Sequence, residues 1–449
     1  MNRPLLLPGL PRVWRDDTEL QLGADPARAV LLRLPDPRAA EILDLLDGTR
    51  PERLVLLRAV ELGIPADQAR AVLEFLHAAG LALPAAALIP RTSTGTVHQR
   101  LVGEATALAF HDRRAAPIPR HVPPALRSGR APTTTLRRRQ VASVLITGRG
   151  RLGAPIAVAL AEAGVGNVWA DVPGSVHEDE LSGGPFRKST IGTPRGEAIA
   201  AAVTQAMPDT NTRHPRTARP SLVVQLDHDR PAALVAAAHA ARRQPHLAVT
   251  IRDGAAVIGP LVPMTGGPCL ACLELHRLDR DASWPGAPRS LTPEPCTVTT
   301  LLTATAYATA EALAYVDGDI PETLGASIEI TGPGRFRRRT WPPHPLCDCS
   351  HRPARAQRKT QPPTEGNNTR RPRATKGDGT RAAAPSTTRH PPEGAGKGRS
   401  RARPAAPSTT QQPPEGTGQE SNGTRAPAPT RHAAATGSPP APPRSAPPD

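Results

Sequence analysis

A glycine-rich turn is the first segment of this chain whose residue types and spacing could do chemistry. The sequence GRGRLG places glycines at Gly148, Gly150 and Gly153. In a turn that joins a strand to a helix, the first glycine permits the bend, the second lets backbone N–H groups approach a pyrophosphate, and the third allows close helix–strand packing. The spacing therefore predicts a phosphate-binding turn.

The segments around this turn fit that prediction. Residues 141–146 are a short β-branched apolar run, and residues 154–164 follow an Ala-rich helical pattern that ends in glycine. A second strand pattern at 167–170 closes on Asp171, where a carboxylate can hold ribose hydroxyls. Strand, glycine turn and helix together favour a nucleotide-binding type of fold over the glycines of an ordinary loop.

Two close pairs of cysteines form the second candidate site. Two residues separate Cys269 from Cys272, and one separates Cys347 from Cys349. Brought together by the fold, the four thiolates would bind a tetrahedral zinc ion with no open position, so the zinc would be structural. A redox dithiol and simply buried cysteines are the alternatives, and Cys296 is left as a free thiol. The histidines near enough in sequence to replace a ligand are His276, His344 and His351.

Strand and helix patterns alternate from residue 141 to about residue 350. Such alternation implies an α/β fold with a Rossmann-like, mostly parallel sheet that helices cover on both faces. Helices are expected at 195–207, 231–242 and 297–316, and strands at 221–226, 246–251, 327–331 and 335–341.

Residues 1–88 have the pattern of a small α+β unit similar to a winged helix. Its expected strands are 21–23 and 30–34, and its expected helices are 36–46, 51–62 and 66–79. The last helix is not rich in Arg, Asn or Gln, so peptide binding at a strand edge is favoured over DNA binding. Residues 89–140 are expected to be a polar connector with one helical piece at 97–110.

The last 99 residues, 351–449, contain no Val, Ile, Leu, Met, Phe, Trp, Tyr or Cys but 19 prolines, so this repeat-containing tail is expected to be disordered. It holds 17 Lys and Arg against 6 Asp and Glu, which is +11 of the net charge of +16. The basic charge is thus a tail property, and it argues against nucleic acid as a partner of the folded part. The tail fits a solvated spacer, with weak attraction to acidic partners as the alternative.

The sequence offers no membrane segment. The apolar run at 5–7 ends at Pro8 and is too short for a signal peptide. The most apolar stretch, 299–316, contains Glu311 and several threonines, which is not typical of a membrane span. An odd number of cysteines also fits a reducing compartment. We expect a cytoplasmic protein with no membrane partner.

The glycine turn, Asp171 and the cysteine pairs together resemble the ThiF and MoeB superfamily, the fold of ubiquitin-activating enzymes, whose members bind ATP and adenylate the C-terminal carboxylate of a small protein or peptide. A narrower resemblance covers nearly all of residues 1–350. It is to the actinobacterial leader-peptide-binding, cyclodehydratase-associated ThiF-like proteins of thiazole/oxazole-modified peptide biosynthesis. The segments that carry it are QLG at 21–23, LLDG at 45–48, PCLACLELHR at 268–277, DASWP at 281–285 and RRTWPPHPLCDC at 338–349.

The superfamily resemblance implies roles for several charged residues beyond Asp171. Arg187 would neutralise the γ-phosphate, and Arg195 stands where the superfamily has a lysine. Magnesium would be held by Asp227 or Asp229. The superfamily's acidic residue two positions after the ribose aspartate is missing, because Pro173 stands there. Solvated surface positions are the alternative for each charged residue.

Cys296 precedes the helix expected at 297–316. The resemblance implies a nucleophilic cysteine there, whose pKa a helix N-terminus would lower. The glycine-rich continuation usual after that cysteine is absent, so an inert, partly buried thiol is the alternative.

Two functions of different classes follow. In the first, residues 1–88 bind a precursor leader peptide and the ThiF-like domain presents it to a separate ATP-dependent cyclodehydratase. In the second, the chain is an adenylyltransferase that uses ATP and magnesium. The arginine at 195 and the missing acidic residue favour the first. A third function, an NAD-dependent oxidoreductase, leaves the cysteines and the N-terminal unit unexplained. A homodimer is compatible with each function.

Overall fold

The computed structural model describes residues 2–90, 95–115, 131–213, 218–286 and 294–351. The tail expected at 351–449 lies outside the described residues, except for its first position. No described helix combines the length and the apolar character needed to cross a lipid bilayer.

Residues 2–90 form two small antiparallel sheets and four α-helices. One sheet has the strand order β2-β3-β4, and the other pairs β1 with β5. Leucines at alternate positions of β3 and β4 point into a core that the helices cover. The elements are β1 (Pro4–Leu6), β2 (Arg12–Trp14), β3 (Glu19–Leu22), β4 (Val30–Arg33), α1 (Ile42–Leu45), α2 (Glu52–Glu61), α3 (Ala66–Ala78), β5 (Ala82–Pro84) and α4 (Ala85–Leu88).

The expected elements of this segment occur with one change. The helix expected at 36–46 is divided into a 3-10 turn (Pro37–Glu41) and the short α1. Asp36 caps that turn by accepting a hydrogen bond from the Arg38 N–H. Strands β1, β2 and β5 were not expected, because three residues are too few for an alternating pattern to show.

Two helices occupy the segment that the sequence indicated to be a connector. Helix α5 (Gly95–Ala115) contains the helix expected at 97–110, and α6 (Pro132–Val141) was not expected. The apolar run expected to be a strand from residue 141 therefore begins later, with β6 (Ser143–Thr147). Leu136 of α6 is fully buried in the large core, although its neighbours in sequence are polar.

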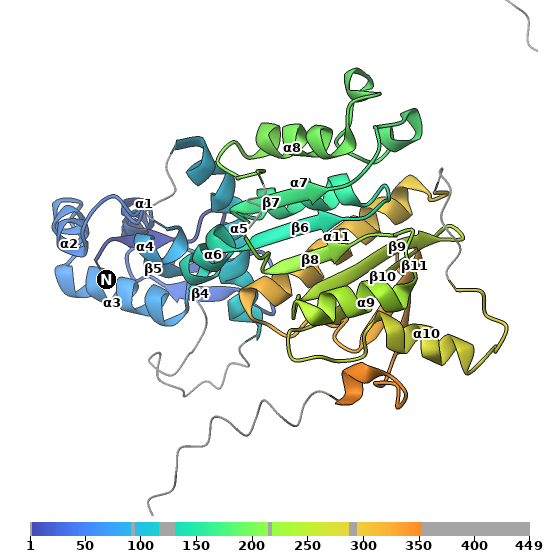
Figure 1. The fold of residues 1–449 in the computed structure, drawn as a ribbon. Coiled ribbons are helices and arrows are strands. Elements are labelled where there is room, and N and C mark those ends of the chain that lie inside the picture. The colour runs from blue at the N-terminus through green and yellow to red at the C-terminus, as the bar shows by residue number, and fades with distance from the viewer. Residues whose placement is uncertain (1, 91–94, 116–130, 214–217, 287–293, 352–449) are drawn as a thin grey trace, which may run out of the picture. The chain divides into compact units, whose positions relative to one another are not determined.

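A seven-stranded sheet in the order β12-β11-β10-β9-β8-β6-β7 forms the centre of residues 131–351 (Figure 1). Strands β7, β6, β8 and β9 are parallel, and β9, β10, β11 and β12 pair antiparallel. The remaining elements are α7 (Gly153–Glu162), β7 (Asn167–Asp171), α8 (Arg195–Ala206), β8 (Leu222–Gln225), α9 (Ala232–Ala241), β9 (His246–Arg252), β10 (Ala255–Val262), α10 (Leu270–Leu278), α11 (Val298–Asp317), β11 (Ala326–Gly332) and β12 (Arg335–Thr340).

The expected α/β class with a mostly parallel sheet is confirmed, since β11 also points in the direction of the parallel strands. Strand β10 and helix α10 were not expected. Gly259 and Pro260 lie inside β10, and proline usually excludes a central strand. The structure accommodates them where the pairing register between β9 and β10 shifts.

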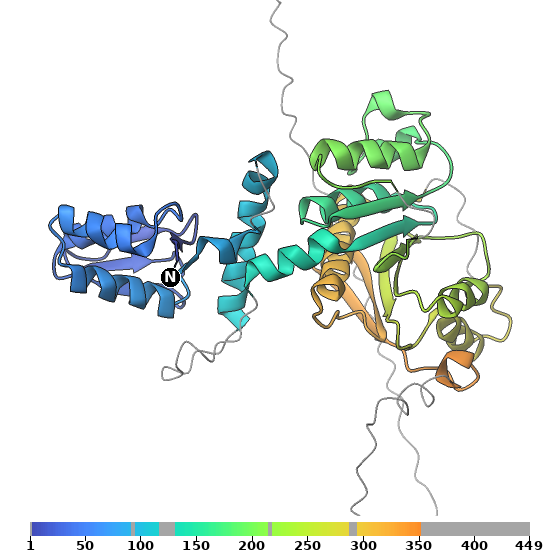
Figure 2. The same ribbon diagram turned by 60° about the vertical axis from the view of Figure 1, so that its left-hand side comes forward.

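Strand β6 lies between its neighbours β7 and β8, which follow it in sequence. The chain therefore reverses direction across the sheet at β6, and ligands of open α/β sheets bind outside the carboxyl ends of the strands at such a point. Helices α7 and α11 pack on one face, and α9 and α10 pack together on the other (Figures 1 and 2). This arrangement places the glycine turn and the residues after β7 and β8 together at the carboxyl ends of the parallel strands.

Candidate functional site

The glycine turn connects β6 to α7 at the carboxyl end of the parallel strands. Gly148 and Gly150 have φ angles of 103° and 138°, which side chains avoid. A Cβ on Gly148 would lie 2.6 Å from the Asp227 carbonyl oxygen, and the Arg149 N–H donates to that carbonyl over 2.7 Å. The first glycine is therefore required because the turn packs against the end of β8.

The other expected nucleotide residues lie at the same edge. A Cβ on Gly153 would lie 2.8 Å from Leu226 Cδ1, so this glycine lets α7 approach the sheet. Asp171 ends β7 with an exposed side chain, and its carbonyl accepts a hydrogen bond from the Gly148 N–H over 3.3 Å. The structure thus brings together the three glycines, Asp171 and Asp227.

A carboxylate that the sequence did not indicate lies against the second glycine. A Cβ on Gly150 would lie 3.1 and 3.3 Å from the two carboxylate oxygens of Glu294. The Arg151 N–H donates to Glu294 Oε2 over 3.0 Å, and the Arg151 side chain reaches the Glu294 carbonyl over 3.4 Å. Glu294 is only 6% exposed. Its carboxylate therefore contacts the turn where the sequence predicted a phosphate.

The surroundings of Glu294 raise its pKa to about 7. Burial is the largest cause, because it disfavours the charged form. The carboxylates of Asp227 and Glu180 raise the pKa further, whereas the N–H and the positive charge of Arg151 lower it. The turn therefore holds a carboxyl group that changes its charge near neutral pH.

The two arginines expected near the phosphates are engaged elsewhere. Arg195 is buried and forms an ion pair with Glu180, with 2.7 Å between Nη2 and Oε1. It also donates to the carbonyls of Pro173 and Ser175. Arg187 donates to the carbonyls of its own neighbours at positions 185 and 186. The buried Arg195 is thus not free to bind a phosphate in this arrangement, whereas Arg187 is exposed and makes its two backbone bonds through Nη1.

The cavity beside the turn is small and rich in acidic groups. Its volume is about 130 Å³, whereas ligand pockets usually enclose about 300–1,000 Å³. Arg149, one of its cations, pairs with Asp229 over 2.7 Å. The small volume and the acidic residues at the turn itself therefore do not fit a nucleoside triphosphate with magnesium, although a larger cavity shares Asp227, His228 and Asp229 with this one. Lining residues are Arg149, Gly150, Arg151, Asp179, Glu180, Arg195, Asp227, His228, Asp229 and Glu294.

Cys296 lies two residues after Glu294 and one residue before the N-cap of α11, Thr297. Its thiol donates to the Thr297 carbonyl over 3.5 Å. Burial raises the pKa of this thiol, and the positive charge of Arg151 lowers it less than burial raises it. This direction is the opposite of the one expected for a nucleophilic cysteine at a helix N-terminus, because the thiolate is disfavoured.

The four remaining cysteines meet in one cluster. Their Sγ–Sγ distances are 3.9 Å for Cys269 and Cys272, 3.6 Å for Cys269 and Cys347, and 3.2 Å for Cys272 and Cys349. Four thiolates at about 2.3 Å from one zinc ion lie about 3.8 Å apart. None of the four forms a disulfide. The cluster could therefore hold a metal ion, with Cys269 at the N-cap of α10.

His344 lies beside the cluster but is oriented by other groups. The Leu346 N–H donates to His344 Nδ1 over 3.1 Å, so the proton resides on Nε2, which donates to Asp279 Oδ2 over 2.9 Å. The His344 backbone N–H donates to Cys272 Sγ over 3.3 Å. Although burial raises the pKa of Cys272, this N–H and the Cys349 thiol lower it below its usual value. His344 thus supports a sulfur ligand through its backbone.

A larger cavity of about 720 Å³ lies over the sheet between α9 and α10. Its floor is polar, because Thr250 and Arg252 of β9 and Glu329 of β11 point into it. Arg277 of α10 lines the same cavity, and burial and the positive charge of Arg252 lower its pKa. This cavity has the size of a ligand pocket. It could not be predicted from the sequence, because its residues come from five strands and two helices.

Comparisons with known proteins establish the fold. No protein-family model matches the chain, and no curated protein matches it. Among solved structures, E. coli MccB with AMPCPP and MccA has a TM-score of 0.51 at 14% identity, covering 78% of this chain and 99% of MccB. PaaA has a TM-score of 0.50 at 13% identity, covering 74% of this chain and 98% of PaaA. The ThiF-type fold expected from the sequence is therefore confirmed.

Proposed function

We propose that this chain recognises the leader of a precursor peptide and presents it to a separate ATP-dependent cyclodehydratase of thiazole/oxazole-modified peptide biosynthesis. The ThiF-like domain would act as a scaffold, with a structural zinc at the four cysteines. The observation that supports this proposal most directly is the free edge of β4, which can accept a peptide as an added strand.

The hydrogen bonds of β4 show which groups face that edge. The Leu34 N–H donates to the Thr18 carbonyl of the β3 side over 2.7 Å. Alternate residues of an antiparallel pair bond in this way, so Leu32 also faces β3. The N–H and C=O groups of Leu31 and Arg33 therefore point to the open side. Their side chains are also exposed, to 40% for Leu31 as a whole and 83% for the Arg33 side chain.

The opposite edge of the same sheet is β2, whose three residues are exposed. The Arg12 guanidinium of β2 donates to Asp44 Oδ1 over 2.5 Å and to the Leu43 carbonyl over 3.4 Å. The side chain of an edge residue thus lies against α1. Within this sheet, β4 has four residues and β2 has three, which favours β4 as the docking strand.

The test measures peptide binding to the full chain by fluorescence anisotropy. The neighbouring genes are first searched for a short precursor rich in Cys, Ser and Thr, and the probe is a labelled peptide with the leader sequence of that precursor. Leu31→Pro removes an N–H that faces the open edge of β4, and Trp14→Pro removes its counterpart on β2. Losing one hydrogen bond weakens binding by roughly tenfold. We expect this tenfold loss for Leu31→Pro but not for Trp14→Pro. The affinity of the wild type for the peptide should change little with salt.

Leu31→Pro could disturb folding, so circular dichroism must first show that the variant is folded. Leu31→Glu is the second variant, because it keeps the N–H but places a charge on the exposed edge. Equal binding by the wild type and both folded β4 variants would exclude the β4 edge. Loss of binding in Trp14→Pro alone would assign the leader to β2.

The second candidate, an ATP-dependent adenylyltransferase, is favoured by the intact backbone of the glycine turn and by Asp171 beside it. MccB, which shares the fold, is a microcin C7 biosynthetic enzyme and was solved with ATP and with N-formylated MccA. Isotope exchange between pyrophosphate and ATP in the presence of precursor distinguishes the two functions. Exchange that Asp171→Ala abolishes would make the chain an adenylating enzyme.

A further inference from the structure

We infer that the carboxyl group of Glu294 occupies the position of a phosphate at the glycine turn, so that this side chain determines what the turn accepts and excludes nucleotides from it. The inference concerns the ThiF-like domain alone. It does not depend on leader binding by the β4 edge.

The turn has the features of an anion site. The N–H groups at the start of a helix are without partners inside the helix and attract negative charge. Helix α7 begins directly after the turn, at Gly153. The Arg151 N–H in that turn donates to Glu294 Oε2 over 3.0 Å. The carboxylate therefore makes the kind of contact that a phosphate oxygen would make.

The same carboxylate fills the approach to Gly150. Its two oxygens lie 3.1 and 3.3 Å from the position of a Cβ on Gly150, so they occupy the space that the missing side chain leaves. In a phosphate-binding turn, that space lets the pyrophosphate approach the backbone. A nucleotide and the Glu294 side chain therefore compete for one volume.

The charges around Glu294 also oppose the binding of a nucleotide. Arg149 is paired with Asp229, and Arg195 with Glu180. Arg151 donates from Nη2 to the Ser182 carbonyl over 3.0 Å and has a buried Nε with no hydrogen-bond partner. The cations that could compensate a triphosphate are thus largely engaged, while the Asp227 carboxylate lines the same small cavity. An added polyphosphate would be repelled as well as sterically excluded.

The experiment measures binding of magnesium ATP and of inorganic pyrophosphate to the full chain by isothermal titration calorimetry. The variants are Glu294→Ala, which removes both the charge and the volume, and Glu294→Gln, which removes the charge alone. Glu329→Ala is the matched control, because it removes a carboxylate that is paired with Arg339 and lines the other cavity.

We expect no binding by the wild type or the control at millimolar ligand, and at least a tenfold gain in affinity for Glu294→Ala. Glu294→Gln should gain less, since the amide still fills the space. Wild-type binding that Glu294→Ala leaves unchanged would overturn the inference. So would a folded Glu294→Ala variant that still binds neither ligand, because another feature would then exclude nucleotides. Leader binding by the same variants should not change, so failure here is distinct from failure of the proposed function.

Discussion

At the scale of single residues, the chemistry of this chain divides into groups that are close in sequence and groups that only the fold brings together. Neighbouring glycines of the turn and the cysteines within each pair are two or three positions apart, so their spacing alone indicates a turn and a pair of ligands. Glu294 lies more than a hundred positions from the turn that it contacts. The one signal near Glu294 in the sequence is Cys296, two positions later. The contact between Glu294 and the turn could therefore not be predicted.

Glu294 should make folding stability depend on pH. Its pKa is raised from 4.5 to about 7 in the folded protein, so the folded state binds more protons than the unfolded state in this range. The stabilisation is complete below pH 4.5 and is lost as the pH rises through 7. At about 1.4 kcal/mol per pKa unit, the total is on the order of 3 kcal/mol.

The measurement is the free energy of urea unfolding at several pH values between 4.5 and 8. Glu294→Gln should remove this slope, because the amide does not titrate. The charged groups that act on Glu294 are Arg151, Asp227 and Glu180, and His228 lines the same cavity. Parallel curves for the wild type and Glu294→Gln would show that Glu294 does not titrate in this range.

The cysteine cluster predicts one zinc ion per chain. Cys269→Ser removes one of four ligands, so elemental analysis should find less zinc, and the melting temperature should fall because binding energy at a structural site is folding energy. Cys296→Ser is the matched control, since Cys296 lies outside the cluster. It should change neither quantity. A wild-type protein without zinc, or an unchanged melting temperature in Cys269→Ser, would contradict this prediction.

At the scale of elements, the long periodic segments were predictable and the context-dependent ones were not. Helices α8, α9 and α11 and strands β8, β9 and β11 lie within a few residues of their expected positions, because each carries an unbroken apolar pattern. Helix α6 does not. Its sequence is polar, and it is positioned by Leu136 and Arg139, whose burial depends on distant parts of the chain.

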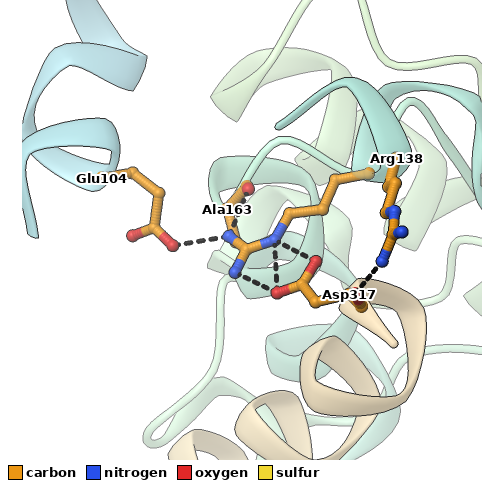
Figure 3. A network of polar contacts seen from close by, with 5 residues as sticks. Glu104, Arg138, Ala163 and Asp317 are labelled. Atoms are coloured by element: carbon orange, nitrogen blue, oxygen red, sulfur yellow. Dashed lines mark hydrogen bonds and ion pairs between the residues drawn. The ribbon is translucent and has the colours of Figure 1, made fainter. Parts of the chain in front are cut away.

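Arg139 of α6 connects its helix to α5 and α11 through a network of polar contacts, and Figure 3 labels its partners Glu104, Ala163 and Asp317. Its guanidinium pairs with Asp317 of α11 over 2.7 Å and with Glu104 of α5 over 2.6 Å, and it donates to the Ala163 carbonyl after α7 over 2.9 Å. Burial lowers the pKa of Arg139, but the bonds and charges of Asp317 and then Glu104 raise it above its usual value. A polar segment is thereby fixed against the core.

Arg139→Met should destabilise the fold strongly. Removing one partner of a buried ion pair costs about 3–5 kcal/mol, because the other charge stays buried without compensation. The free energy of urea unfolding measures this cost. Arg138→Met is the matched control, since Arg138 donates only to the Asp317 carbonyl, and should cost far less. Equal effects of the two variants would mean that the ion pair is not what fixes α6.

At the scale of the whole molecule, composition divides the chain into a part rich in large apolar residues and a part that has none. The described residues form two large apolar core clusters, one within residues 2–90 and one dominated by residues 131–351. Residues 352–449 contain no large apolar side chain that could join either cluster. They also carry 17 basic and 6 acidic residues, so the folded part has a net charge of only +5. The apolar cores and most of the net positive charge therefore lie in different parts of the chain.

Truncation after residue 351 should leave the melting temperature unchanged, because no core residue is removed. Circular dichroism melts of the full and truncated chains measure this. Elution of the truncated chain from a cation exchanger should shift to lower salt, since +11 of the charge is lost. Truncation after Trp341 is the control. It also removes Cys347 and Cys349, and should lower the melting temperature as Cys269→Ser does. A chain ending at residue 351 that melts early or aggregates would show that the tail stabilises the folded part.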